Sequence, residues 1–191
     1  AGKTSVLESI LFANKKVSAK GKIDSGNTAS DYTKEEKEAK MSIYSTVCPV
    51  EKGDVKVNFI DTPGFFDFVG EAEEAVSAAD AAIIVVSGKA GVEVGTERAW
   101  ELCEKYKLPR MFFVTEMDID NASFRQVVED LTERYGKKIA PFHLPIRENE
   151  KFVGYVNVIT ETGYRWEGKE VVECEIPEAN KEYLENYRET L

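Results

Sequence analysis

The sequence predicts an α/β fold in which a mainly parallel, doubly wound sheet carries a small α+β insert. Apolar strand-like runs alternate with helical patterns over most of the chain, which is typical of such sheets. Residues 81–86 are continuously apolar, as expected of a strand covered on both faces. After about residue 146 short strand patterns replace this alternation. We therefore expect one domain over residues 1–146 and part of an insert over residues 147–191.

The elements follow from these patterns in order. A helical pattern over residues 6–12 comes first, and the polar stretch 15–40 predicts a long mobile loop. Two strand-like runs joined by Glu-Lys-Gly-Asp predict a β-hairpin over residues 43–60. The later elements alternate, and we expect helices over residues 68–79, 95–106 and 123–135 and strands over 81–86, 111–114 and 139–144. The insert is expected to contain strands over residues 152–159 and 170–176 and a helix from Pro177 to Tyr187.

Composition excludes several classes of protein. The formal net charge of −10 argues against a broad basic surface, so we expect no direct sequence-specific binding of nucleic acid by this domain. No apolar run approaches the about 18 residues needed to cross a bilayer, and no signal peptide is visible. The three cysteines are widely spaced without a metal-ligand pattern, which favours free thiols in the cytoplasm.

The chain begins with half of a phosphate-binding loop. Such a loop reads Gly-x-x-x-x-Gly-Lys-Ser/Thr between a strand and a helix, and only Gly2, Lys3 and Thr4 are present here. Its N–H groups cradle phosphate, its lysine neutralises phosphate oxygens and its hydroxyl binds magnesium. Gly-Lys-Thr alone is a weak signal that also occurs by chance. The missing strand would be central in the sheet, so we expect the working protein to contain it before Ala1.

A stronger signal is Asp61-Thr62-Pro63-Gly64, which follows a strand-like run. The Asp61 carboxylate would hold magnesium through water, and the Gly64 N–H would meet a γ-phosphate oxygen. A simple strand-ending turn is the alternative, because Pro-Gly is common in turns. Together with Gly-Lys-Thr upstream, the motif favours a GTP-binding switch domain with the fold of the P-loop NTPases. It predicts GTP or GDP and Mg²⁺ as ligands.

A third signal concerns the base of the nucleotide. Where Asn-Lys-x-Asp is expected, after residues 111–114, the sequence has Thr115-Glu116-Met117-Asp118. Asp118 can still accept guanine N–H donors, whereas Thr115 replaces only part of the amide's bonding and Glu116 brings a negative charge. Losing one such buried bond costs about 1–3 kcal/mol, so we expect weakened nucleotide binding. The alternative is a strand end followed by a helix-capping aspartate.

One more hydroxyl is a candidate magnesium ligand. Ser42 lies just before the predicted hairpin, where a hydroxyl could reach a magnesium ion when GTP is bound. A surface serine that opens a strand is an equally good explanation. The candidate magnesium ligands are therefore Thr4, Ser42 and Asp61.

With these residues placed, the chain resembles the GTPase domain of elongation factor G and its paralogues over essentially its whole length. The resemblance rests on extended strings, namely Asp61-Thr62-Pro63-Gly64-Phe65-Phe66-Asp67-Phe68-Val69-Gly70-Glu71, Ala90-Gly91-Val92-Glu93-Val94-Gly95-Thr96-Glu97, Leu108-Pro109-Arg110 and Pro141-Phe142-His143-Leu144-Pro145-Ile146. The stretches Gly26-Asn27-Thr28 and Lys40-Met41-Ser42-Ile43 are more similar to the elongation factor G-like paralogue branch than to the principal factor.

The resemblance implies roles for the motif residues. Gly2, Lys3, Thr4 and Ser5 would surround the phosphates, Asp61 and Gly64 would complete that site, and Thr115, Met117 and Asp118 would surround guanine. Lys3 and Gly64 would act on the γ-phosphate during hydrolysis. The resemblance also implies a monomer that binds the ribosome, with the insert from about residue 147 facing the stalk proteins.

Three departures from the family pattern limit the prediction. Phe65 stands where the family has the histidine that orients the attacking water, Thr115-Glu116 replaces Asn-Lys, and Ser42 replaces threonine. A phenyl ring offers water no conventional donor or acceptor. We therefore expect a GTPase weakened by Phe65 and Thr115-Glu116. A nucleotide-binding module that docks on ribosomes with little hydrolysis, and a ribosomal protection factor, remain alternatives.

Overall fold

The structure, a computed structural model, describes residues 2–149, 151–168 and 170–191. The chain divides into two compact units, one formed by Ala1–Val85 with Glu93–Phe113 and the other by Val86–Val92 with Val114–Leu191. The boundary expected at residue 146 lies inside strand β5 (His143–Glu148). The division into a 1–146 domain and a 147–191 insert stays a prediction.

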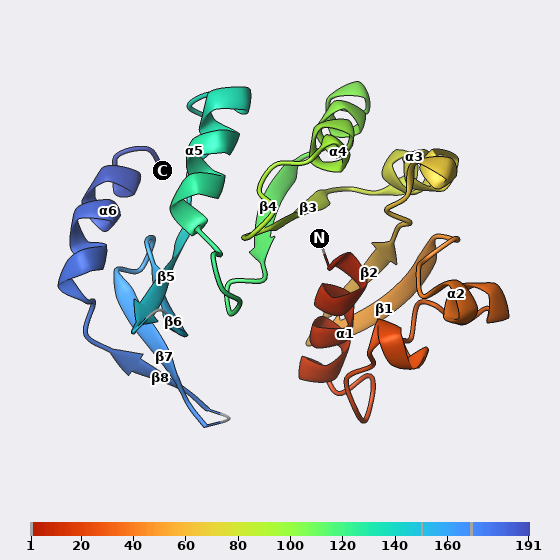
Figure 1. Ribbon diagram of the computed structural model, residues 1–191, viewed down its shortest axis with the longest axis horizontal. Coiled ribbons are helices and arrows are strands. Elements are labelled where there is room, and N and C mark those ends of the chain that lie inside the picture. Colours follow the sequence, from red (N-terminus) through yellow and green to blue (C-terminus); the bar gives the residue numbers. More distant parts are fainter. Residues whose placement is uncertain (1, 150, 169) are drawn as a thin grey trace. The chain divides into compact units, whose positions relative to one another are not determined.

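The first unit begins with a helix packed on a β-hairpin (Figure 1). Helix α1 (Lys3–Ala13) lies beside strands β1 (Thr46–Lys52) and β2 (Val55–Asp61), which pair antiparallel. Apolar side chains from these elements form a buried cluster that consists of Leu7, Leu11, Cys48 and Val50. Because α1 begins at the phosphate motif and β2 ends at Asp61, this packing brings the two motifs together.

The polar stretch between α1 and β1 is folded, in contrast to the mobile loop expected from its composition. It contains η1 (Ile23–Ser25) and helix α2 (Lys34–Ala39), which has a capping box at Thr33. Two glutamates, Glu8 on α1 and Glu36 on α2, are only 1% exposed. Both accept backbone N–H groups of this stretch, and these bonds replace the periodic apolar contacts that the sequence lacks.

Strands β3 (Ala82–Ser87) and β4 (Arg110–Thr115) form a second, separate pair. The Ala82 N–H donates to the Pro109 carbonyl and the Gly88 N–H donates to the Thr115 carbonyl, so the two strands run parallel. The elements that precede and connect them are η2 (Phe66–Phe68), α3 (Val69–Ala78) and α4 (Val94–Lys105). The helices and parallel strands expected here are therefore present.

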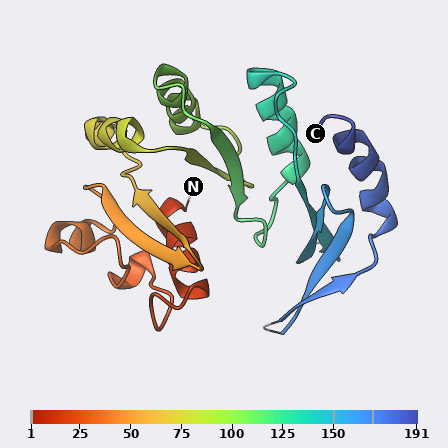
Figure 2. The same ribbon diagram turned by 180° about the vertical axis from the view of Figure 1, so that it is seen from behind.

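The second unit consists mainly of an antiparallel sheet covered by helices. Its four strands are β5, β6 (Lys151–Asn157), β7 (Thr162–Glu167) and β8 (Glu170–Cys174), in that order. Helix α6 (Glu178–Arg188) lies beside this sheet in Figures 1 and 2, with Leu184 in its core. Helix α5 (Phe124–Tyr135) belongs to the same unit.

One expectation about strands needs correction, and another is not confirmed. The strand expected over residues 139–144 is instead His143–Glu148, and it pairs antiparallel with β6. The strands form three sheets of two, two and four strands, so the described pairings do not join them into one doubly wound sheet. The fold is mixed α/β. No helix among the described residues has the length and apolar character that a membrane crossing requires.

Candidate nucleotide and magnesium site

The amino end of helix α1 is arranged as an anion site. Gly2 caps the helix in the left-handed region, with φ 75°, a conformation that favours glycine. The first turn carries no acidic residue and no side-chain cap, so its N–H groups lack a side-chain acceptor and the positive end of the helix dipole favours an anion. Lys3, Thr4 and Ser5 occupy this turn, with Thr4 buried and Ser5 exposed. The geometry is suited to a phosphate group.

The three predicted magnesium ligands lie together in the first unit. The Thr4 hydroxyl donates to Asp61 Oδ2 at 2.8 Å, and the Thr4 and Ser42 hydroxyl oxygens are 3.2 Å apart. These residues come from the start of α1, the segment after α2 and the end of β2. Thr4 and Asp61 are buried. Ser42 is therefore part of a hydroxyl–carboxylate cluster in this structure, although its position in the sequence also fitted a surface serine.

Sequence reasoning missed two members of this cluster. The Ser30 hydroxyl donates to Asp61 Oδ2 at 2.9 Å, and the Asp31 carboxylate is 3% exposed. Asp31 Oδ2 accepts the Thr28 hydroxyl, whereas its Oδ1 has no hydrogen-bond partner among the described residues. Neither residue belongs to a motif with fixed spacing. The only signal was a group of small polar side chains inside the stretch taken as a loop.

The charges of the cluster fit a divalent cation. Burial raises the pKa of Asp61, and Asp31 adds to that rise, while hydrogen bonds from Thr4 and Ser30 and the charge of Lys3 act in the opposite direction. The unpartnered Asp31 oxygen is a further acceptor that a hydrated cation could satisfy. All candidate donors are oxygens, which Mg²⁺ prefers, and few carboxylates are needed because substrate phosphates complete such sites.

Lys3 and Gly64 are in direct contact range. A Cβ added at Gly64 would lie 2.7 Å from Lys3 Nζ, so the chain after Asp61 passes close to the lysine. Burial lowers the pKa of Lys3, and the Asp61 carboxylate partly opposes that effect. Among the described residues the Gly64 N–H has no protein acceptor. A phosphate oxygen near Lys3 Nζ could accept this N–H.

Phe65 points to solvent and has no polar function. It is 57% exposed and caps η2 with an extended backbone. The next ring, Phe66, lies under the Arg98 guanidinium at 4.2 Å. His143, the chain's single histidine, is in the second unit, where it packs against Phe142 and Tyr155. Burial lowers its pKa.

The predicted base loop lies in the second unit. The Thr115 hydroxyl donates to the Val86 carbonyl at 3.2 Å, and Met117 is buried. Glu116 adopts a left-handed backbone, with φ 57°, and its carboxylate accepts the Ser87 hydroxyl. Asp118 is exposed, so its carboxylate is accessible to guanine N–H groups. The Glu116 carboxylate is thus held by the β3 end.

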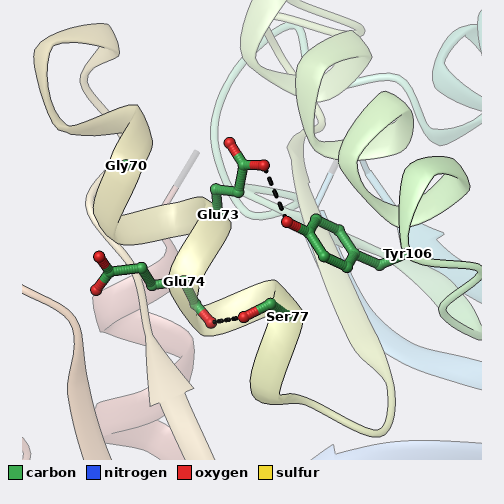
Figure 3. Close-up of a pocket in the computed structure, with 5 residues that line it drawn as sticks. All are labelled: Gly70, Glu73, Glu74, Ser77 and Tyr106. Carbon is green, nitrogen blue, oxygen red and sulfur yellow. Dashed lines mark hydrogen bonds between the residues drawn. The ribbon is translucent and has the colours of Figure 1, made fainter.

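A pocket elsewhere in the first unit does not fit a nucleotide. It has a volume of about 320 Å³ and is lined by Gly70, Glu73, Glu74, Ser77 and Tyr106 (Figure 3). The Tyr106 hydroxyl donates to Glu73 at 2.9 Å, and Lys105 pairs with the same carboxylate. Its two glutamates would repel phosphate. None of the predicted site residues lines it.

Comparison with known proteins agrees with this geometry. The family model described as the elongation factor Tu GTP-binding domain matches residues 1–185. The chain belongs to this family. It is 33% identical over 169 residues to the mitochondrial ribosome-releasing factor 2 of Anopheles gambiae, covering 88% of this chain and 23% of that protein. The corresponding Culex quinquefasciatus protein is 33% identical over 166 residues, covering 87% of this chain and 22% of that protein.

A solved structure supports the same assignment. The crystal structure of ttk003000868 from Thermus thermophilus matches with a TM-score of 0.93 and 38% identity, over 98% of this chain and 28% of that chain. The resemblance to translational GTPase domains of the elongation factor G type is thereby confirmed. The chain spans less than a quarter of the curated relatives it matches. The roles of individual site residues in this GTP-binding domain stay predictions.

Replacing Gly64 with alanine is expected to weaken binding of a non-hydrolysable GTP analogue by about 10-fold, the equivalent of one lost hydrogen bond. The new Cβ would lie 2.7 Å from Lys3 Nζ and displace either the lysine or the Gly64 N–H. GDP lacks the γ-phosphate, so its affinity should change little. Isothermal titration calorimetry measures both. Gly70→Ala is the matched control because its Cβ would meet nothing within 4 Å; equal losses for the two nucleotides would contradict the prediction.

Restoring the usual base motif should strengthen nucleotide binding. The double variant Thr115→Asn, Glu116→Lys is expected to raise GDP affinity by roughly 5- to 150-fold, the value of one recovered buried hydrogen bond. Fluorescent GDP titration measures the change. Glu133→Lys makes the same charge reversal at an exposed position on α5 and should leave the affinity unchanged. Equal GDP affinities of wild type and double variant would show that Thr115 and Glu116 do not limit binding.

Proposed function

We propose that this domain binds GTP with Mg²⁺ and hydrolyses it slowly, as the switch of a ribosome-associated translation factor. The observation that carries the proposal is the convergence of Thr4, Ser42 and Asp61, within the unit where Lys3 approaches Gly64. Family membership supports GTP as the nucleotide. The names of the relatives support the ribosome as partner, because those proteins are called ribosome-releasing factors.

One group of residues would bind the phosphates and Mg²⁺, and another would detect the γ-phosphate. The first turn of α1 and Lys3 would bind phosphate oxygens, and Thr4 and Ser42 would hold Mg²⁺ directly while Asp61 holds it through water. A bound ion would neutralise charge on the phosphates. Gly64 would donate its N–H to the γ-phosphate, and Ser42 would be needed only while that phosphate is present. Loss of the γ-phosphate would then release both segments.

Slow hydrolysis follows from Phe65. Its exposed ring can neither accept a proton from water nor orient it. The attacking water would need a group from the ribosome or from the substrate phosphate itself. Thr115 and Asp118 would contact the base, with affinity limited because Glu116 is turned toward Ser87.

The finer assignments rest on the family resemblance. We expect the segment from residue 147 to face ribosomal stalk proteins, and the protein to act as a monomer. The strands of the first unit would belong to one doubly wound sheet of the P-loop NTPase type, which the TM-score of 0.93 to the Thermus thermophilus structure supports. The cytoplasm is the compartment predicted from the sequence, although the names of the two insect relatives say mitochondrial.

A second candidate is a GTP-binding module that docks on ribosomes with almost no hydrolysis. Phe65, Thr115 and Glu116 favour it, whereas Lys3 beside Gly64 and the Thr4–Asp61 contact favour an intact γ-phosphate response. The deciding measurement is phosphate release from GTP by the full-length protein, with and without ribosomes. Release above background that rises with ribosomes supports the GTPase. GTP binding without release in either condition supports the docking module.

A further inference from the structure

Glu36 accepts an unusual number of hydrogen bonds for a residue on a short polar helix. Its Oε2 accepts the Thr33 N–H at 3.1 Å and the Thr33 hydroxyl at 2.8 Å. Its Oε1 accepts the Ile43 N–H at 3.0 Å and the Tyr44 N–H at 3.2 Å. The side chain is 1% exposed. A buried carboxylate of this kind requires such donors to remain ionised.

Only half of this bonding serves the helix. A capping box needs the N-cap residue alone, here Thr33, whose side chain accepts the Glu36 N–H in return. The Ile43 and Tyr44 N–H groups lie beyond the helix and directly follow Ser42 in the chain. The Glu36 carbonyl also accepts the Met41 N–H at 3.2 Å. Glu36 therefore holds the backbone on both sides of Ser42.

The charge of Glu36 is matched to this task. Burial alone would raise the pKa of its carboxyl, but the hydrogen bonds from Ile43, Thr33 and Tyr44 outweigh burial and lower the pKa. The carboxylate is thus ionised at neutral pH and accepts four charge-assisted bonds. Such bonds fix the backbone of residues 41–44 more firmly than solvent-exposed contacts would.

We propose that Glu36 is a positioning residue that holds Ser42 where its hydroxyl meets the Thr4 hydroxyl, which in turn donates to Asp61. The inference rests on the proposed function, because Ser42 matters only if it serves the magnesium ion and the γ-phosphate. Glu36 therefore couples the folding of α2 to the placement of Ser42. GTP would bind better than GDP because only GTP uses Ser42 in its held position. The stability of that position depends on the Glu36 carboxylate.

The first test is the variant Glu36→Gln. The amide has nearly the same shape, but it is neutral and its NH₂ group cannot accept a backbone N–H, so the charge assistance and at least one of the four bonds are lost. We expect affinity for a non-hydrolysable GTP analogue with Mg²⁺ to fall roughly 10- to 100-fold, while GDP affinity stays within about 2-fold. Glu38→Gln is the matched control, since Glu38 lies on the same helix and is exposed. An equal fall for both nucleotides would overturn the proposal.

A double-mutant cycle with Ser42→Ala separates positioning from general stability. If Glu36 acts through Ser42, adding Glu36→Gln to Ser42→Ala causes little further loss of the analogue's affinity. Additive losses would assign Glu36 an independent role and overturn the proposal. Thr33→Val removes the side-chain part of the capping box but leaves the Ile43 and Tyr44 bonds. It should preserve the GTP preference; a loss as large as that of Glu36→Gln would point to helix capping instead.

Amide hydrogen exchange of the wild-type protein tests the same proposal without any variant, in case the variants fail to fold. The Ile43 and Tyr44 amides should exchange at least about 10-fold more slowly with the GTP analogue and Mg²⁺ than with GDP. Equal exchange in both states would overturn the proposal. If the wild-type protein binds neither nucleotide, the proposed function itself fails. A protein that binds both nucleotides but shows no change in Glu36→Gln refutes only the role of Glu36.

Discussion

Replacing Lys3 with alanine is expected to lower GTP affinity by roughly 100- to 1000-fold. Charge-assisted hydrogen bonds from a buried amine contribute about 1.5–3 kcal/mol each, and Lys3 would make more than one to the phosphates. The lysine is half-buried, its Nζ lies close to Gly64, and the Asp61 charge is nearby. No neighbouring side chain of this turn can replace its charge, because the next two residues are threonine and serine.

Calorimetry with GTP, GDP and Mg²⁺ measures this effect. Both nucleotides should lose affinity, since both carry the β-phosphate that Lys3 would contact. Lys20→Ala removes the same charge at an exposed position in the stretch after α1 and is the matched control. Losses of equal size in the two variants would show that only net charge matters. If Lys3→Ala binds GTP as tightly as the wild-type protein, the phosphates do not bind at the amino end of α1.

The positions of the motif residues in the first unit could be predicted because these residues lie at the ends of secondary-structure elements. Lys3 and Thr4 start a helix and Asp61 ends a strand, and both belong to motifs whose spacing is visible in the sequence. Packing of α1 on the hairpin then brings the two ends together. The sequence does not separate a magnesium-binding Ser42 from a surface serine, because the placement of Ser42 depends on a stretch without periodicity.

The supporting residues could not be predicted for the same reason. Glu8 lies in an apolar helical pattern and Glu36 in a lysine- and glutamate-rich stretch. Both look like ordinary solvated charges, yet both are buried against backbone N–H groups. The Ser30 hydroxyl contacts Asp61, and the charge of Asp31 acts on Asp61, only after that stretch has folded. Hydrogen bonds between distant backbone and side-chain groups leave no repeating pattern in a sequence. Periodicity likewise gave strand 139–144 too early and did not reveal its antiparallel partner.

Replacing Phe65 with histidine should increase ribosome-stimulated GTP hydrolysis by about 100-fold or more, the usual contribution of a positioned group that handles a proton. Position 65 directly follows Gly64, which lies against Lys3, so its side chain has access to the γ-phosphate end of the proposed site. The present ring is 57% exposed, so the substitution removes little buried apolar surface. Single-turnover phosphate release by the full-length protein measures the rate.

The neighbouring residue provides the control for Phe65→His. Phe66→His introduces the same imidazole one position later, where the native ring lies under Arg98 and faces α4. It should therefore give no acceleration. Phe65→Leu should match the wild-type rate, because neither side chain can orient water. If Phe65→His is no faster than Phe65→Leu, another group already orients the attacking water, and the aromatic residue is not what limits hydrolysis in this domain.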